Sequence, residues 1–370
     1  MATQQIPVVV LAGFLGSGKT TLLNHLLGAG AGTRIGAIVN DFGSIEIDAM
    51  TVAGQVDSMV SLGNGCLCCA VDTSELDTYL ERLARPAARI DVIVIEASGL
   101  AEPEELIRMI LASENDRIVY GGLVEVIDAA EFAGTRARHP ELDRHVGIAD
   151  LVVLNKADRI GDAARQELMD TLADLAPGRP VVCTAYGRID PELFFDRGAG
   201  EDLEAGVRQL SFEDLLRESA GDPASTAGNP HVEHDEHHGH DHGPGELCTH
   251  LHAAYQSVEF TSSEPMNPRR LMDFLDSRPA GLYRIKGFVH FDVPGSRQKF
   301  TVHAVGDFLR FYPSPWGRDE ERSTQLVLIG SGIDAAALRK ELATCRDDAP
   351  QEASEHSMWG VLRYVAAREE

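Results

Sequence analysis

The residues with the clearest chemistry stand close to the start of the chain. The segment GFLGSGKT at 13–20 fits the G-x-x-x-x-G-K-[ST] pattern, after an apolar run and before a segment with helical spacing. In such a loop, backbone N–H groups surround a phosphate, and the helix adds a positive dipole end. The lysine is expected to reach the β- and γ-phosphates, and the threonine hydroxyl to bind Mg²⁺. The pattern predicts a nucleoside triphosphate site made by Gly13, Gly16, Ser17, Gly18, Lys19, Thr20 and Thr21.

A second motif indicates which base the nucleotide carries. Asn155, Lys156 and Asp158 form an N-K-x-D sequence after an apolar run, at the edge where ligands meet a parallel sheet. The Asp158 carboxylate can accept hydrogen bonds from guanine N1–H and its exocyclic amine, which adenine does not offer. Lys156 can lie over the ring, and Asn155 can tie this loop to the phosphate loop. Alone, the tetrapeptide is often a polar turn. After a phosphate loop it favours GTP over ATP, and 182–185 resembles the further loop that GTPases place against the base.

Two other segments are candidates for sensing the γ-phosphate. An apolar run at 92–95 ends in Glu96, with Gly99 close behind, which suits the Mg²⁺ shell and a switch loop. Asp41 follows the next strand after the phosphate-loop helix, where a first switch would lie, although an ordinary turn is the alternative. No arginine finger is evident, so slow intrinsic hydrolysis is expected. The predicted catalytic residues are Lys19, Thr20 and Glu96.

Three cysteines lie close together between the two candidate switches. Cys66, Cys68 and Cys69 cannot all form unstrained disulfides. Thiolates are soft ligands that suit Zn²⁺ or another transition ion. No second cysteine pair lies nearby, so we expect a transferable metal, with a carboxylate or water in the last position. Buried core cysteines are the alternative.

A histidine-rich tract stands further along the chain. Residues 231–252 hold eight of the fourteen histidines, interleaved with acidic residues. Imidazole with carboxylate suits Zn²⁺, Ni²⁺ or Co²⁺, so the tract can capture metal weakly and pass it inward. A solvated polar linker is the alternative. The candidate ligands here are His234, His237, His238, His240 and His242.

The elements that must position these motifs alternate between strand and helix. Continuously apolar runs indicate a sheet covered on both faces, and the alternation predicts parallel βαβ units in an α/β domain. The predicted strands are 6–12, 34–40, 90–97, 118–127, 149–154 and 180–184, and the predicted helices are 20–27, 74–84, 104–111 and 163–175.

Composition changes sharply after about residue 215. The following stretch is rich in Gly, Pro, Ser, Asp and His, which predicts a flexible linker. Strand-like runs return at 256–260, 282–292, 299–304, 308–312 and 325–329, with helical stretches at 268–276 and 334–344. We therefore predict a P-loop GTPase domain at 1–215, a His-rich linker at 216–252, a smaller α+β domain at 253–348 and a tail at 349–370.

Charge and composition exclude several classes of protein. The 370 residues carry 33 basic and 58 acidic side chains, a net charge of −25, which disfavours nucleic acid and anionic lipid as partners. No apolar run is long enough to span a membrane, and no signal pattern is present. Clustered cysteines favour metal chemistry over secreted disulfides, so a cytoplasmic location is expected. Whether the protein is a monomer or a dimer stays open.

Together the motifs resemble the CobW-type metallochaperone GTPases, relatives of the GTPases that load nickel into hydrogenase and urease. The resemblance implies that the three cysteines hold the metal and that Glu96 and the first switch respond to Mg·GTP. It departs mildly at Asp41, where Glu is common, and at Glu102, where Asp is common. The segments that carry it are 13–20, 40–43, 64–69, 96–103, 155–158, 281–291 and 324–330.

The combined prediction is a GTP-hydrolysing metallochaperone that delivers a transition metal to a client metalloprotein. Its expected cofactors are GTP, Mg²⁺ and a transition metal, with Zn²⁺ favoured over Co²⁺, Ni²⁺ or Fe²⁺. One alternative is a metal buffer or sensor that GTP gates without any client. Another, a P-loop kinase with a structural zinc, is disfavoured by the N-K-x-D motif and by the absence of an evident acceptor-site motif. Neither the client nor the physiological metal follows from the residues.

Overall fold

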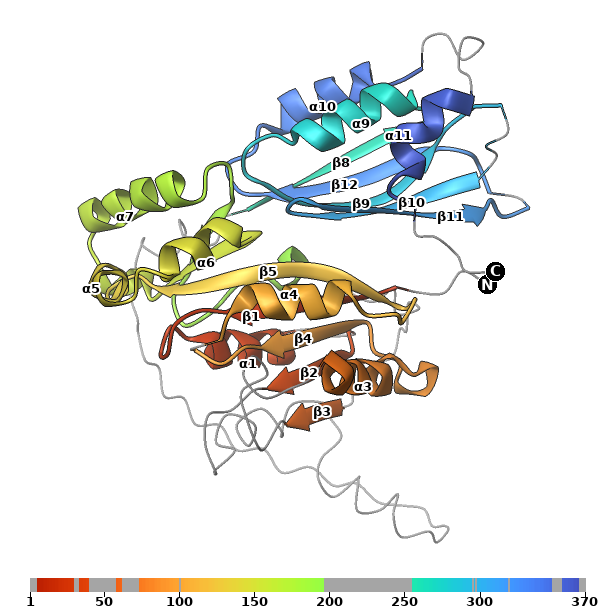
Figure 1. Cartoon of the computed structure of the whole chain (residues 1–370). Coiled ribbons are helices and arrows are strands. Elements are labelled where there is room, and N and C mark those ends of the chain that lie inside the picture. The colour runs from red at the N-terminus through yellow and green to blue at the C-terminus, as the bar shows by residue number, and fades with distance from the viewer. Residues whose placement is uncertain are drawn as a thin grey trace, which may run out of the picture. The chain divides into compact units, whose positions relative to one another are not determined.

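Two sheets organise the part of the chain that the structure describes (Figure 1). In this computed structural model, one sheet has seven strands and the other has five. The described residues are 5–29, 33–39, 58–61, 73–99, 101–195, 255–294, 296, 298–318, 320–347 and 355–365.

The N-terminal sheet is parallel, and strand pairing sets the position of each motif. Its order is β3-β2-β4-β1-β5-β6-β7, so the strand that precedes the phosphate loop lies in the centre. The strands are β1 (Ile6–Ala12), β2 (Ile35–Val39), β3 (Ser58–Ser61), β4 (Val92–Glu96), β5 (Ile118–Asp128), β6 (Leu151–Asn155) and β7 (Val181–Cys183).

Helices cover both faces of this sheet. Val9 and Leu11 of β1 pack with Leu22 of α1 in one core, whereas Val8 and Val10 lie in a second core on the other face. The second core also contains side chains of α3, α4 and α6. The predicted α/β fold with two covered faces is therefore confirmed. The helices are α1 (Lys19–Ala29), α3 (Thr73–Ala84), α4 (Pro103–Leu111), α5 (Phe132–Arg138), α6 (Leu142–Ile148) and α7 (Asp162–Leu175).

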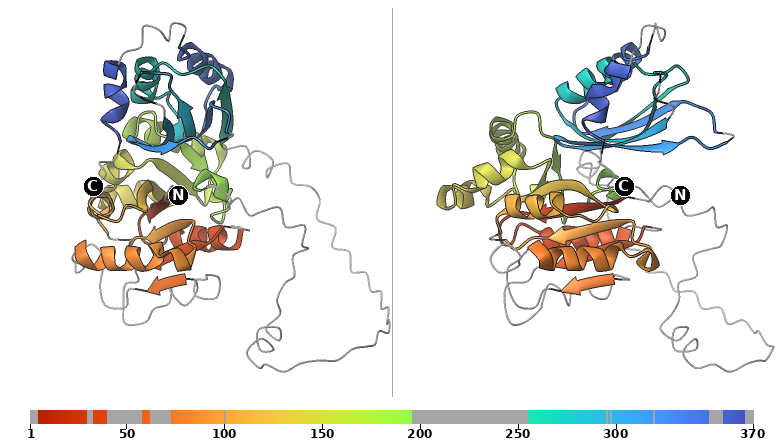
Figure 2. Two further views of the ribbon diagram at one scale, coloured as in Figure 1. Left: turned by 90° about the vertical axis from the view of Figure 1, so that its right-hand side faces the viewer. Right: turned by 45° about the vertical axis from the view of Figure 1, so that its right-hand side comes forward.

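The C-terminal sheet is antiparallel, with helices on one face (Figures 1 and 2). Alternate residues of β8 are buried, as expected for a strand with one covered face. Val361 of α11 packs in the same core, so the core includes a residue of the segment predicted as a tail. The elements are β8 (Gln256–Ser262), α9 (Pro268–Ser277), β9 (Leu282–His290), β10 (Gln298–Val305), β11 (Phe308–Pro315), β12 (Thr324–Gly330), α10 (Ala335–Thr344) and α11 (Trp359–Leu362).

Several contacts from the C-terminal residues end on backbone carbonyls of the N-terminal part. Ser331 Oγ donates to Val181 O at 3.2 Å, and Arg284 donates to Phe194 O at 3.3 Å. His303 Nε2 lies 2.8 Å from Tyr120 O. On the N-terminal side, these contacts depend on the backbone and not on the side chains.

Within the described ranges, no helix is long and apolar enough to cross a membrane. The predicted linker at 216–252 lies outside those ranges.

Candidate nucleotide-binding site

The loop between β1 and α1 depends on glycines in backbone conformations that other residues rarely adopt. Gly13, Gly16 and Gly18 have φ of 139°, 76° and 104°. A Cβ at Gly13 would overlap the carbonyl oxygen of Val126 on β5, and one at Gly18 would overlap the side-chain amide of Asn155. The loop therefore packs against the ends of two neighbouring strands at a distance that only glycine permits.

Lys19 is the buried cation of this loop. It is the first residue of α1 and is only 7% exposed. Its Nζ donates to Gly13 O at 2.8 Å and to Phe14 O at 3.3 Å, so the ammonium lies within the curve of the loop. An ammonium in this position can attract a phosphate, as the motif predicts.

Two residues predicted as Mg²⁺ ligands are in direct contact. Thr20 Oγ1 donates to Glu96 Oε1 at 2.6 Å across 76 residues of sequence. Glu96 is the last residue of β4, which pairs with β1, and it is 4% exposed. The strand pairing thus brings a hydroxyl and a carboxylate together beside the phosphate loop.

Asn155 links the base motif to the phosphate loop. It ends β6 and is 1% exposed. Its Nδ2 donates to Ser17 O at 2.9 Å, while its Oδ1 accepts from Gly187 N at 3.0 Å. One side chain therefore fixes both the phosphate loop and the loop after β7. At the start of that second loop, the carbonyl oxygen of Thr184 accepts a hydrogen bond from Ala157 N at 3.1 Å.

Lys156 and Asp158 lie beside this link. Lys156 has φ of 56°, in the left-handed region, and its Nζ donates to Gly16 O at 2.7 Å. The same Nζ contacts Asp128 Oδ2 at 2.7 Å. Asp158 is exposed and lies in the short 3₁₀ helix Ala157–Arg159, which follows β6. Asp128, which the sequence analysis did not single out, ends β5 in register with Asn155.

The segment after Glu96 packs directly on the phosphate loop. A Cβ at Gly99 would stand 2.7 Å from the backbone nitrogen of Leu15, so even alanine there would push the two segments apart. Leu15 itself is 76% exposed. A predicted switch and the phosphate loop thus meet through backbone, where a small shift of one displaces the other.

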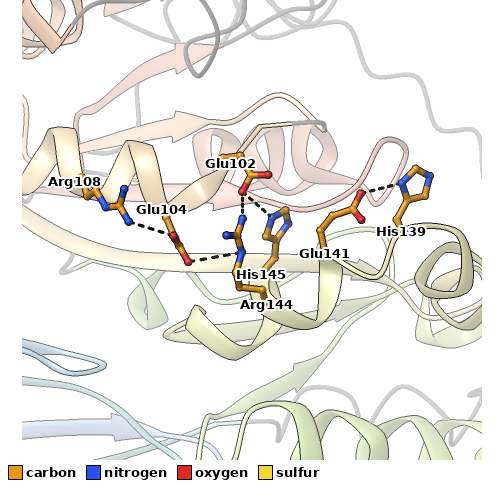
Figure 3. A network of polar contacts seen from close by, with 7 residues as sticks. All are labelled: Glu102, Glu104, Arg108, His139, Glu141, Arg144 and His145. Carbon is orange, nitrogen blue, oxygen red and sulfur yellow. Dashed lines mark hydrogen bonds and ion pairs between the residues drawn. The ribbon is translucent and has the colours of Figure 1, made fainter.

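A network of charged side chains lies behind this segment (Figure 3). Glu102, just before α4, pairs with Arg144 of α6 and lies 3.5 Å from His145. Arg144 also approaches Glu104 at 3.7 Å, and Glu104 pairs with Arg108. These side chains are mostly half-exposed, and such pairs contribute little stability. They connect α6 to the start of α4.

A buried carboxyl group beneath the loop was not foreseen. The run at 118–127 was expected to be continuously apolar, but Glu125 lies within it and is 1% exposed. Burial raises the pKa of Glu125 to about 8, although the charge of Lys19 acts in the opposite direction. Both groups lie where phosphate charge is expected.

The predicted transition-metal ligands lie outside the described residues. These are Cys66, Cys68, Cys69, His234, His237, His238, His240 and His242. Asp41, the candidate of the first switch and a further possible metal ligand, lies outside them too. Within the ranges that are described, no cluster of three or more His, Cys, Asp or Glu side chains could hold a metal ion.

Comparison with known proteins supports the interpretation of these motifs as a nucleotide-binding site. The nucleotide-binding domain of the CobW/HypB/UreG family matches residues 7–183, and the C-terminal domain of the cobalamin synthesis protein CobW matches 255–346. A zinc chaperone CobW from a Sinorhizobium species is 30% identical over 369 residues, which cover 90% of this chain and 96% of the relative. The chain belongs to the CobW family. It is therefore a P-loop GTPase of a family of GTP-dependent metal chaperones.

Two other similar proteins extend the comparison. A zinc chaperone CobW from Pseudomonas aeruginosa is 31% identical over 378 residues, with 92% of this chain and 91% of the relative covered. Among solved structures, the Zn(II)-bound YjiA GTPase from Escherichia coli is 22% identical. That comparison covers 93% of this chain and 100% of the other, with a TM-score of 0.41.

Proposed function

We propose that the protein uses GTP hydrolysis to control the binding of a transition metal, zinc first, and its delivery to a client metalloprotein. The observation that supports this most directly is the contact between Thr20 and Glu96 beside the phosphate loop. It joins the loop to the strand that leads into the predicted switch. A change at the γ-phosphate can therefore reach the switch through one side-chain pair.

The residues present fit a magnesium ion. Mg²⁺ prefers oxygen ligands, and the Thr20 hydroxyl and Glu96 carboxylate are two oxygens 2.6 Å apart. Thr20 and Glu96 would hold the ion, which supplies charge neutralisation for the phosphates when bound. Lys19 provides a second positive charge at the same loop. The protein contributes position and charge to the attack of water on the γ-phosphate.

The segment that carries the three cysteines starts from the same edge of the sheet. β3 ends at Ser61, and the chain runs through Cys66, Cys68 and Cys69 before α3 begins at Thr73. Because β3, β2, β4 and β1 are parallel, the carboxyl ends of all four lie at one edge. The cysteine segment thus follows a strand that ends at the same edge of the sheet as β1, which supports the proposed coupling of metal and nucleotide. Relatives named zinc chaperones make zinc the first metal to test.

The nucleotide part of the proposal is tested by base selectivity. We expect GTP to compete with a fluorescent guanine nucleotide far better than ATP does, and Asp158→Ala to remove most of that preference. Asp174→Ala, on the exposed surface of α7, is the matched control. Equal competition by GTP and ATP in the unmodified protein would refute the guanine assignment.

The metal part is tested by titrating Zn²⁺ against a chelating dye with Mg·GTP or Mg·GDP present. Allosteric couplings are typically about 1–3 kcal/mol, so zinc affinity should differ between the two states by at least roughly fivefold. Serine at Cys66, Cys68 and Cys69 should abolish the tight site and leave GTP binding intact, whereas Cys345→Ser, in the C-terminal domain, should change neither. Equal zinc affinities in both nucleotide states would favour a static metal buffer over a GTP-controlled chaperone.

A further inference from the structure

Glu125 occupies an unusual position for an acidic residue. It lies on β5 in register with Ala12, the last residue of β1 before the phosphate loop. Its side chain lines a cavity of about 360 Å³ together with Phe14, Gly16 and Ser17 of that loop. A carboxyl group is therefore buried directly against the residues that are expected to surround phosphate.

Two polar atoms at this cavity lack hydrogen-bond partners within the described residues. They are Glu125 Oε2 and Ser17 Oγ, both fully buried. An ionised carboxylate with an oxygen that accepts no hydrogen bond is costly to bury, so the neutral acid is the form that this environment favours. The raised pKa of Glu125, about 8, agrees with this. Lys19, whose Nζ donates to the Gly13 and Phe14 carbonyls, lowers the pKa of Glu125 through its charge, but burial has the larger effect.

The other charged groups around Glu125 have partners of their own or line the same cavity. On α4 and α6, which also pack on β5, the charged side chains of Figure 3 pair with one another. Asp143 of α6 pairs with Arg136. Among the charged groups of the described residues, Lys19 is thus the one whose charge acts on Glu125. The remaining charged side chains that line the cavity are Asp128, Glu131, Arg138, Lys156 and Arg159.

We propose that Glu125 is a positioning residue of the nucleotide site that must keep its proton when a nucleoside triphosphate is bound. An ionised Glu125 would compete with the phosphates for the charge of Lys19 and would repel them across the floor of the loop. The neutral acid leaves the full charge of Lys19 to the phosphates and can also donate a hydrogen bond into the cavity. This inference rests on GTP binding at the phosphate loop, as proposed above.

A direct consequence is that nucleotide binding takes up a proton. With half of Glu125 ionised near pH 8, binding of a slowly hydrolysed GTP analogue with Mg²⁺ should absorb about half a proton. Calorimetry at pH 8 in two buffers of different ionisation enthalpy measures this number on the unmodified protein. The uptake should be absent in Glu125→Gln, which keeps the shape of the side chain and cannot ionise. No uptake by the unmodified protein would overturn the proposal.

The affinity for the same analogue should show the same linkage. We divide the dissociation constant of the unmodified protein by that of Glu125→Gln. This ratio should rise about tenfold between pH 7 and pH 9. Taking the ratio cancels the titration of the nucleotide itself. Glu105→Gln, exposed on α4, should behave like the unmodified protein. Should Glu125→Gln fold poorly, Glu125→Met serves as a second non-ionising variant.

The outcomes separate this inference from the proposed function. If all variants bind the analogue at pH 7 and lose affinity in parallel as the pH rises, the role of Glu125 is overturned and the GTP site stands. Absence of binding in the unmodified protein at pH 7 would overturn both.

Discussion

Replacing Gly18 with alanine tests the link between the phosphate loop and the base motif. Gly18 has φ of 104°, and an added Cβ would overlap Nδ2 of Asn155. That amide donates to Ser17 O at 2.9 Å, and Oδ1 of the same residue accepts from Gly187 N at 3.0 Å. A methyl group at this position must therefore displace the Asn155 side chain, which breaks both hydrogen bonds.

The cost has two parts. A residue other than glycine in this backbone region is strained by about 1–3 kcal/mol. Each buried polar group that loses its hydrogen bond costs a further 1–3 kcal/mol or so. We therefore expect Gly18→Ala to lower the free energy of unfolding by at least about 3 kcal/mol. Gly16→Ala is the matched control, because its φ is also positive, at 76°, but no atom lies within 4 Å of the added Cβ. Strain alone should cost about 1–2 kcal/mol there.

Urea unfolding measures these differences. It is applied to the two glycine variants, to Asn155→Ala alone and to Asn155→Ala combined with Gly18→Ala. Gly18→Ala should be less stable than Gly16→Ala by at least about 2 kcal/mol. It should also bind GDP more weakly. Adding Asn155→Ala to Gly18→Ala should cost little more, since the two changes remove the same bonds. Equal stability of the two glycine variants, or a fully additive double variant, would refute the reasoning.

Three shorter predictions follow from other contacts. Gly306→Ala should destabilise the protein by more than about 2 kcal/mol in thermal unfolding, because its φ is 50° and the new Cβ would overlap buried Asp150. Gly332→Ala, where φ is 68° and the space around the Cβ is open, should cost less. Glu125→Gln should stabilise the protein, because a raised carboxyl pKa means that the unmodified protein loses stability as the pH rises from 4.5 toward 8. The gain in the free energy of unfolding, measured in urea, should be small near pH 5 and reach about 3 kcal/mol at pH 7. A gain independent of pH would contradict the buried carboxyl. Thr20→Ala should weaken GTP binding on the order of tenfold in Mg²⁺ and hardly in EDTA, with Thr20→Ser near normal; an equal loss in EDTA would argue against a magnesium role.

Motifs confined to a short stretch of sequence were predictable. The first strand was expected at 6–12 and β1 has the same bounds, because its apolar run stops at the glycine loop. The link from Asn155 to the phosphate loop was also expected, and the Nδ2–Ser17 O bond confirms it. In both cases the chemistry of the motif requires the neighbouring structure, so local pattern is enough.

Other features depend on which distant segments become neighbours. Lys156 pairs with Asp128 only because β5 and β6 are adjacent in register, which no local pattern reveals. β3 has four residues and was not predicted, since so short a run with serine at both ends carries no clear period. The helices α5 and α6 have seven residues each, too few for a recognisable apolar stripe. Glu125 was hidden inside an apolar run, and only its register beside β1 makes it informative.

The contacts of Ser331, Arg284 and His303 with backbone carbonyls have a consequence for how such proteins can diversify. Every residue has a carbonyl group, so substitutions on the GTPase side leave these acceptors in place as long as the strands keep their course. Gly281 N even bonds to the carbonyl of another glycine, Gly178. At these positions, an exchange of one half of the gene between relatives would need no matching side chain on the GTPase side, whereas the ion pair of Arg179 with Asp307 would need both partners.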